Sequence, residues 1–355
     1  MGRTLAGTIL LTLALVGHAT AQPEENGENG GRWRNGGTQL MRHHLMGEEL
    51  RAASGGDDLP TGKVDQEQTP AQTLKGALAN ETAQDLLGDY MAGRVPVAFA
   101  ALSEADQARF AALLHDHAGN PTAQAYLLRG LASSNSVDDM SWFSGEIKGR
   151  DAAWLRNNAT LTGDDPLTQQ YSASCVPTVS QALRGELDPV YALRTRQGGD
   201  VHSYDGTDPE AYNPGAAQEQ RTLLEGGGGV PVARDMPNGA GLQMDPFQDV
   251  MTQAGQGSGL SYEWAATPNG EDAAAILDAN LGRGIPTPLR IEGGYVGHAV
   301  LGVDSRVDAA GATEYQIYDP WFGTLTWVPR DAVVNDQVDV GTHQPEVTHA
   351  FRATY

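Results

Sequence analysis

Three residue types that together can carry out nucleophilic chemistry occur far apart in the chain, in the order Cys, His, Asp. Cys175 is the only cysteine among the 355 residues, so it can form neither an intramolecular disulfide nor a Cys-based metal site. A thiolate is a strong nucleophile, an imidazole can take up and return a proton, and a carboxylate can orient the imidazole. The elements that carry Cys175, His298 and Asp319 therefore decide what this chain can do.

Cys175 is expected at the N-terminus of a helix. The helical spacing rests on three apolar residues, Val176, Val179 and Leu183. The pattern predicts a helix that begins near Ser174 or Cys175 and ends at Gly185, and Pro177 is compatible with its first turn. The free N–H groups and the dipole at a helix N-terminus favour a thiolate. A small buried hydrophobic residue is the alternative interpretation of this cysteine.

Four strands are predicted between residues 285 and 329. They cover 285–291, 297–303, 314–319 and 323–328, and the turn residues between them indicate an antiparallel meander. His298 starts the second strand and Asp319 ends the third. Because paired antiparallel strands bring these ends side by side, the carboxylate can hold one ring nitrogen while the other faces a thiol. Each residue taken alone would be an ordinary turn residue.

These segments resemble the papain-fold cysteine peptidases, and within them the branch of bacterial bacteriocin-leader-processing peptidase domains. That branch has a Gln six residues before its Cys, a Gly-His strand segment and an Asp-Pro-x-x-Gly turn. This chain supplies Gln169, Gly297-His298 and Asp319-Pro320-Trp321-Phe322-Gly323. It departs from the family in having Cys175-Val176-Pro177, where members often have Cys-Gly-Pro. The resemblance covers about residues 160–335 and includes no transporter, so the leader-processing role is not carried over.

The resemblance implies an α+β, papain-like fold, in which the helix carrying the Cys packs on an antiparallel sheet and an N-terminal helical segment precedes both. It implies that Cys175 is the nucleophile, that His298 is its general base and later acid, and that Asp319 orients His298. The Gln169 amide and the backbone N–H of Cys175 would form the oxyanion hole. Gln170 is the alternative donor, because the register follows from spacing alone.

The chain divides into four parts by composition. Arg3, an apolar run too short to span a membrane and Ala19-Thr20-Ala21 together predict a signal peptide. We therefore expect a secreted or periplasmic protein that is cleaved near Ala21. The expected parts are a signal peptide (1–21), a disordered Gly- and Glu-rich tail (22–65), a helical segment (66–155) and a papain-like catalytic domain (156–355).

The helical segment shows clear start signals. A helix is expected from 71 to 91, a second opens at the capping-box-like Ser103, and a third at Asn120-Pro121. The segment is either an inhibitory propeptide that covers the cleft or a subdomain that packs permanently. Residues 195–245 are expected to be loop-like, and 271–281 to be helical.

The charge balance restricts the partners. Lys and Arg number 23 and Asp and Glu number 45, which gives a net charge of −22. This argues against nucleic acid as a partner, because phosphate binding needs clustered Lys and Arg. No segment after the signal peptide is expected to span a membrane. No metal site or cofactor is predicted, and the glycines at 255–259 lack the βαβ context of a dinucleotide site.

The sequence thus predicts a secreted cysteine peptidase or amide hydrolase that acts on a peptide or protein substrate through a Cys-His-Asp triad. Two alternatives remain. The same residues on the same fold could serve a transglutaminase-like acyl transferase, or the fold could be kept as a non-enzymatic binding module.

Overall fold

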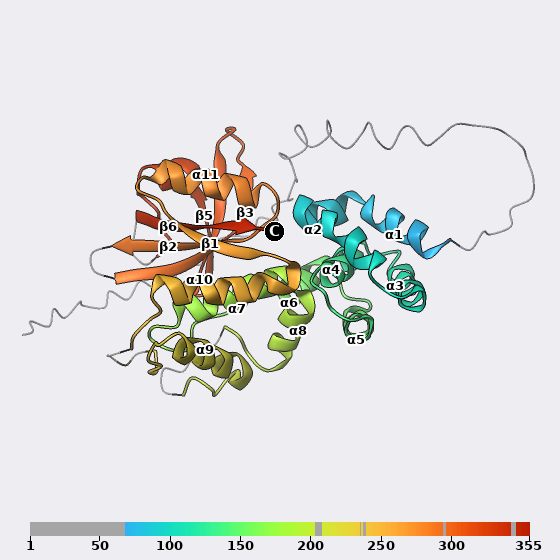
Figure 1. Ribbon diagram of the computed structural model, residues 1–355, viewed down its shortest axis with the longest axis horizontal. Helices are drawn as coiled ribbons and strands as arrows, with labels where there is room; N and C mark the ends of the chain where they lie inside the picture. The colour runs from blue at the N-terminus through green and yellow to red at the C-terminus, as the bar shows by residue number, and fades with distance from the viewer. Residues whose placement is uncertain (1–67, 203–207, 235, 237–238, 294–295, 342–345) are drawn as a thin grey trace, which may run out of the picture. The chain divides into compact units, whose positions relative to one another are not determined.

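The computed structural model describes residues 68–202, 208–234, 236, 239–293, 296–341 and 346–355. An N-terminal helical region is followed by a six-stranded antiparallel sheet with helices packed against it (Figure 1). This confirms the predicted α+β class. The predicted signal peptide and tail lie outside the described residues, so their assignment stays a prediction.

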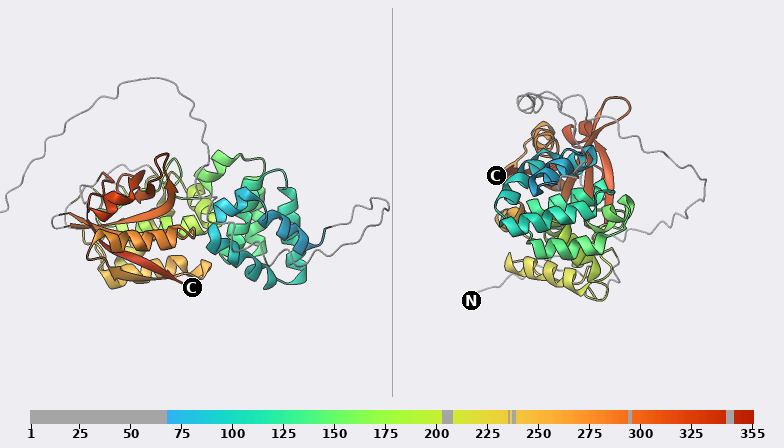
Figure 2. Two further views of the ribbon diagram at one scale, coloured as in Figure 1. Left: turned by 90° about the horizontal axis from the view of Figure 1, so that it is seen from above. Right: turned by 90° about the vertical axis from the view of Figure 1, so that its right-hand side faces the viewer.

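Six helices form the helical region, and Figure 2 shows them gathered together in blue to green. They are α1 (Pro70–Leu78), α2 (Glu81–Ala100), α3 (Glu104–Asp116), α4 (Pro121–Ala132), α5 (Val137–Ile147) and α6 (Ala152–Asn158). A Ser, Thr, Asn or Asp side chain caps the N-terminus of each one, which accounts for the precise starts of these short helices. Among the described helices, none is long and apolar enough to cross a bilayer.

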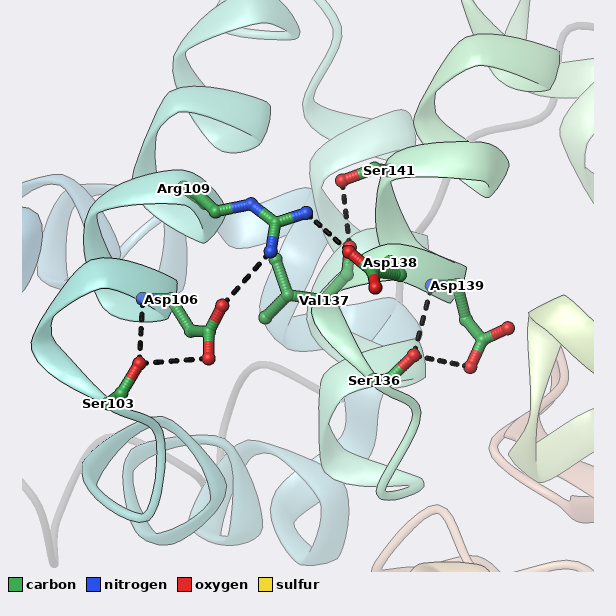
Figure 3. Close-up of polar contacts among 8 residues, drawn as sticks. All are labelled: Ser103, Asp106, Arg109, Ser136, Val137, Asp138, Asp139 and Ser141. Carbon is green, nitrogen blue, oxygen red and sulfur yellow. Dashed lines mark hydrogen bonds and ion pairs between the residues drawn. The ribbon is translucent and has the colours of Figure 1, made fainter.

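Figure 3 shows two of these caps and an arginine that bridges their helices on the surface of the region. Ser103 caps α3 and Ser136 caps α5, each accepting from the backbone N–H three residues later at 3.1 Å. Arg109 of α3 then bridges Asp106, at 3.1 Å, and Asp138 of α5, at 2.5 Å. These ion pairs are exposed to solvent, so they align the two helices more than they stabilise them.

The single helix expected from 71 to 91 is wrong. The chain breaks after Leu78, because the Asn80 side chain accepts from the Thr82 N–H at 3.0 Å and starts a new helix. The starts expected at Ser103 and at Asn120-Pro121 are confirmed.

The sheet has the strand order β1-β6-β2-β3-β4-β5, and all neighbours are antiparallel. Its strands are β1 (Ser261–Ala266), β2 (Thr287–Gly293), β3 (Val296–Val307), β4 (Thr313–Asp319), β5 (Thr324–Pro329) and β6 (Glu346–Thr354). The four strands of the predicted meander are confirmed as β2 to β5. Strands β1 and β6 were not predicted, because they pair with partners distant in sequence, such as Tyr262 with Ala353.

In the described part of the remaining chain, six further helices and a short 3₁₀ helix accompany the sheet. They are α7 (Cys175–Leu187), α8 (Pro189–Gln197), α9 (Pro214–Gly226), α10 (Met244–Gly255), the 3₁₀ helix η2 (Gln256–Ser258), α11 (Gly270–Leu281) and α12 (Arg330–Val334). Helix α11 covers one face of the sheet, whereas α7 and α10 cover the other (Figure 1). Apolar residues of α11 and the strands form one core, and those of α7, α10 and the strands belong to another.

Two expectations in this part are wrong. Gly185 does not end α7, which continues to Leu187. This glycine instead permits close packing, since a Cβ there would lie 2.7 Å from Cγ of Leu161. The segment 195–245 is not all loop. Its Asn213-Pro214 pair starts helix α9, because the Asn213 side chain accepts from the Ala216 N–H at 2.9 Å.

Side chains of α10 cover the outer edge of β1. The backbone N–H of Trp264 donates to Oε1 of Gln248 at 3.0 Å, and the N–H of Tyr262 donates to Oγ1 of Thr252 at 3.1 Å. The Thr252 hydroxyl donates in turn to the Tyr262 carbonyl at 3.1 Å. These polar groups of the terminal strand are therefore satisfied within the chain.

The helical region shares a core with the sheet and its helices. Buried residues of α2 and α4 belong to the same apolar cluster as those of α7, α10 and β6. Hydrogen bonds reinforce this packing: Arg129 donates to the Glu186 carbonyl at 3.1 Å, Ser133 to the Leu187 carbonyl at 2.6 Å, and Tyr90 to the Ser258 carbonyl at 2.8 Å. This shared core favours a permanent subdomain over a removable propeptide.

A close backbone contact at Gly88 gives a test of that interface. Gly88 interrupts α2 with φ 64° and ψ 169°, and a Cβ there would lie 2.7 Å from Cα of Gly284 and 2.8 Å from the Arg283 carbonyl oxygen. Gly88→Ala should lower the free energy of unfolding by about 2–4 kcal/mol, through backbone strain and overpacking. Gly93→Ala in the same helix is the control, since a Cβ there meets nothing within 4 Å. Equal urea midpoints for the two variants would show that the contact carries no stability.

Candidate active site

The start of α7 exposes its first N–H groups to Cys175. The Ser174 hydroxyl is not used as a cap on this helix. It bonds instead with the Tyr171 carbonyl, at 3.1 Å, and with Oε1 of Gln220, at 3.0 Å. The thiol is half-buried, and the backbone N–H groups of Ala299 and Val176 help to lower its pKa. The helix start is thus arranged to stabilise negative charge on sulfur.

The buried side chain of Gln220, from α9, anchors the segment before this helix. Its Oε1 accepts from the backbone N–H of Gln170 at 2.8 Å as well as from Ser174, and its Nε2 donates to the Thr168 carbonyl at 3.3 Å. A loop that would otherwise leave buried polar groups unpaired is therefore fixed in place. Sequence reasoning missed Gln220, because nothing in a polar helix distinguishes it.

His298 and Asp319 lie together, as the meander predicted. Leu301 pairs with Tyr318, so Asp319 comes opposite Val300, and His298 follows two residues along the same side of β3. Nε2 of His298 lies 2.9 Å from Oδ1 of Asp319. An ionised carboxylate only accepts, so Nε2 is the protonated nitrogen and Nδ1 is left for the thiol.

Asp319 is fully buried, and the turn after it supplies a second donor. The backbone N–H of Trp321 donates to the same Oδ1 at 2.7 Å. The Arg234 guanidinium lies 4.5 Å from the centre of the Trp321 ring and donates to the Trp321 carbonyl. The carboxylate is therefore held on one side by a rigid turn while it holds the imidazole on the other.

The thiol and the imidazole shift one another's ionisation. Burial raises the pKa of the Cys175 thiol, but the hydrogen bond and charge of His298 outweigh it and lower the pKa overall. Burial alone would lower the pKa of His298, but its hydrogen bonds with Asp319 and Cys175 raise it to about 9. These opposite shifts favour a thiolate–imidazolium pair at neutral pH.

Gln169 lies next to the turn that follows Asp319. Its side-chain amide donates a hydrogen bond within its own segment, whereas the resemblance implies that it faces the oxyanion. Its backbone N–H donates to the Pro320 carbonyl at 2.9 Å, next to Asp319. Its Nε2 donates to the Tyr171 carbonyl at 2.9 Å, which leaves one N–H of the amide for another acceptor. The alternative donor, Gln170, directs its Nε2 back to Thr168 at 3.1 Å. An oxyanion role for Gln169 stays a prediction.

Cys175 and His298 line one cavity of about 220 Å³. Its remaining wall comes from α7, from α10 and the segment before it, and from β2 and β3. Those residues are Val176, Gly241, Leu242, Gln243, Met244, Phe247, Arg290, Gly297 and Ala299. None of the described residues that line this cavity comes from the helical region. Sequence reasoning missed the apolar wall of Leu242, Met244 and Phe247, and the charged residue Arg290, because these segments meet only in the folded chain.

No known protein family matches this chain, and no curated protein matches it in sequence. Within the part of the chain that the structure describes, no group of three or more His, Cys, Asp or Glu side chains could hold a metal ion.

Proposed function

We propose that the protein is a cysteine hydrolase that cleaves peptide or amide bonds, on a fold of the papain type. One observation carries the proposal: His298, held at 2.9 Å by the buried Asp319, lines the same cavity as the helix-terminal thiol of Cys175 and lowers the pKa of that thiol. A sheet covered by the helix that bears the cysteine supports the papain-like assignment.

In this mechanism the Cys175 thiolate attacks the carbonyl carbon, and the C–N bond breaks as His298 gives its proton to the leaving amine. The acyl group is then bonded to sulfur. His298 next takes a proton from water, which attacks the thioester and releases the acid and the thiolate. Asp319 keeps the imidazole in the tautomer that both steps need.

Labelling of the single cysteine, followed by a peptide library, tests the proposal. An epoxide or chloromethyl-ketone peptide should modify Cys175 much faster than it modifies a free thiol, and library peptides should be cleaved with uptake of water. Adding a primary amine distinguishes hydrolysis from acyl transfer. A Cys175 that reacts no faster than free cysteine, with no cleavage of any peptide, would refute the proposal.

The pH dependence of activity follows from the two shifts. Because the pKa of Cys175 is lowered, the thiolate persists below the usual thiol range, which is near 8.5. Because the pKa of His298 is raised to about 9, the imidazolium persists until about that pH. Activity should therefore rise in the acid range, reach a plateau around neutrality and fall near pH 9, with both limbs belonging to the coupled pair. A single rise centred near pH 8.5 would indicate an unpaired thiol.

A further inference from the structure

The cavity beside Cys175 contains one cationic side chain that the proposed mechanism does not use. Arg290 of β2 lines it together with Cys175 and His298, and the other described residues that line it are uncharged. The charge of Arg290 is balanced by Glu292 and that of His298 by Asp319, so what distinguishes this wall is the hydrogen-bond donors of a guanidinium and not a net positive charge.

The local backbone is shaped to admit this guanidinium. Arg290 pairs with Ala299 across the strands, and its side chain crosses the neighbouring Gly297, which immediately precedes His298. A Cβ on Gly297 would lie 2.7 Å from Nε and 2.9 Å from Nη2 of Arg290. Any larger residue at 297 would therefore displace the guanidinium from this position.

Arg290 keeps donors for a further acceptor. Its Nη2 lies 2.7 Å from Oε1 of Glu292, and the arginine side chain is 31% exposed. Among the described residues, Glu292 is the only carboxylate paired with it. A guanidinium has five N–H groups in a planar fork, so a single contact through Nη2 leaves donors for a second carboxylate. The apolar wall of Leu242, Met244 and Phe247 would contact the methylene groups that lead to it.

We propose that Arg290 is a specificity residue, and that the cavity takes a substrate group consisting of a carboxylate on a short apolar stem. This deepens the proposed function and rests on it. The carboxylate has two possible sources, an acidic side chain next to the scissile bond or the free C-terminus of a peptide.

Alkylation of the single cysteine tests the carboxylate preference without a substrate. Iodoacetate and iodoacetamide have nearly the same shape and differ in charge, and Cys175 is the only thiol that either can modify. The rate of alkylation by iodoacetate, divided by the rate with iodoacetamide, should fall about fivefold or more in Arg290→Gln, because the cationic partner of iodoacetate is lost. His298 attracts iodoacetate in both proteins, so the comparison isolates Arg290. Glu292→Gln should raise the ratio, since it frees the guanidinium.

Arg306→Gln is the matched control. Arg306 is also a strand arginine, and its Nη2 lies 2.7 Å from Oε2 of Glu314, but it is not among the residues that line the cavity. An unchanged ratio in Arg290→Gln, or an equal fall in Arg306→Gln, would overturn the inference. If wild-type Cys175 reacts slowly with both reagents and no peptide is cleaved, the proposed function itself fails, which is a distinguishable result.

Three reporter peptides distinguish the sources of the carboxylate: one with Glu beside the scissile bond and an amidated C-terminus, one with Gln and a free C-terminus, and one with Gln and an amidated C-terminus. Faster cleavage of the first by wild type but not by Arg290→Gln assigns the side chain, and the same pattern with the second assigns the C-terminus. Equal cleavage of all three by wild type would contradict the inference.

Discussion

Cys175→Ala should reduce hydrolysis by about 10⁴-fold or more while leaving the fold intact, because it removes the proposed nucleophile. The thiol is half-buried at a helix start, where alanine is tolerated sterically. Activity is measured on a peptide selected from the library, and folding by circular dichroism and the urea midpoint.

Ser174→Ala is the control for this substitution, because it alters the adjacent residue without touching the thiol. It removes the hydroxyl contacts with Tyr171 and Gln220, so it should lower stability and reduce activity far less than Cys175→Ala does. A Cys175→Ala protein that retained wild-type turnover would remove this residue from the chemistry altogether.

His298→Ala should lower activity by a similar factor, about 10⁴-fold, because the residues of a triad act as a unit. It should also move the onset of Cys175 alkylation by iodoacetamide to higher pH, since the hydrogen bond and charge that lower the thiol pKa disappear. A fully active His298→Ala variant beside an inactive Cys175→Ala variant would disprove the pair.

His117 offers a matched control for His298. Both are buried, and Nε2 of His117 lies 2.9 Å from the Ser144 hydroxyl, much as Nε2 of His298 lies 2.9 Å from Asp319. His117→Ala should reduce stability without shifting the alkylation of Cys175. Asp319→Asn should lose less activity than His298→Ala. It should also shift the fall of activity at alkaline pH to lower pH, because it removes a charge that raises the pKa of His298.

The sequence was most informative where contacts are local. His298 and Asp319 belong to consecutive strands of one meander, so the strand pattern alone brought them together. The helix that begins at Cys175 followed from three apolar residues in its first turns and from its start signals. These parts of the fold and the site depend on neighbours within about twenty residues, where periodicity determines geometry.

The unpredicted parts depend on contacts between distant segments. Strand β6 lies between β1 and β2, and no pattern in residues 346–354 indicates that it inserts there. The cavity wall combines Phe247 of α10 with Arg290 of β2, and Gln220 of α9 anchors the segment before Cys175. Each of these residues is ordinary for its own element, so its contribution emerges only from tertiary packing.

The covered edge of β1 has a consequence for self-association. Terminal strands with free N–H and C=O groups recruit other extended chains, which leads to intermolecular sheets and aggregation. An incoming strand at β1 would find the N–H groups of Tyr262 and Trp264 already bonded to Thr252 and Gln248, and it would have to displace helix α10. Helix α10 therefore blocks growth of the sheet beyond β1, which protects the protein against polymerisation by strand addition at this edge.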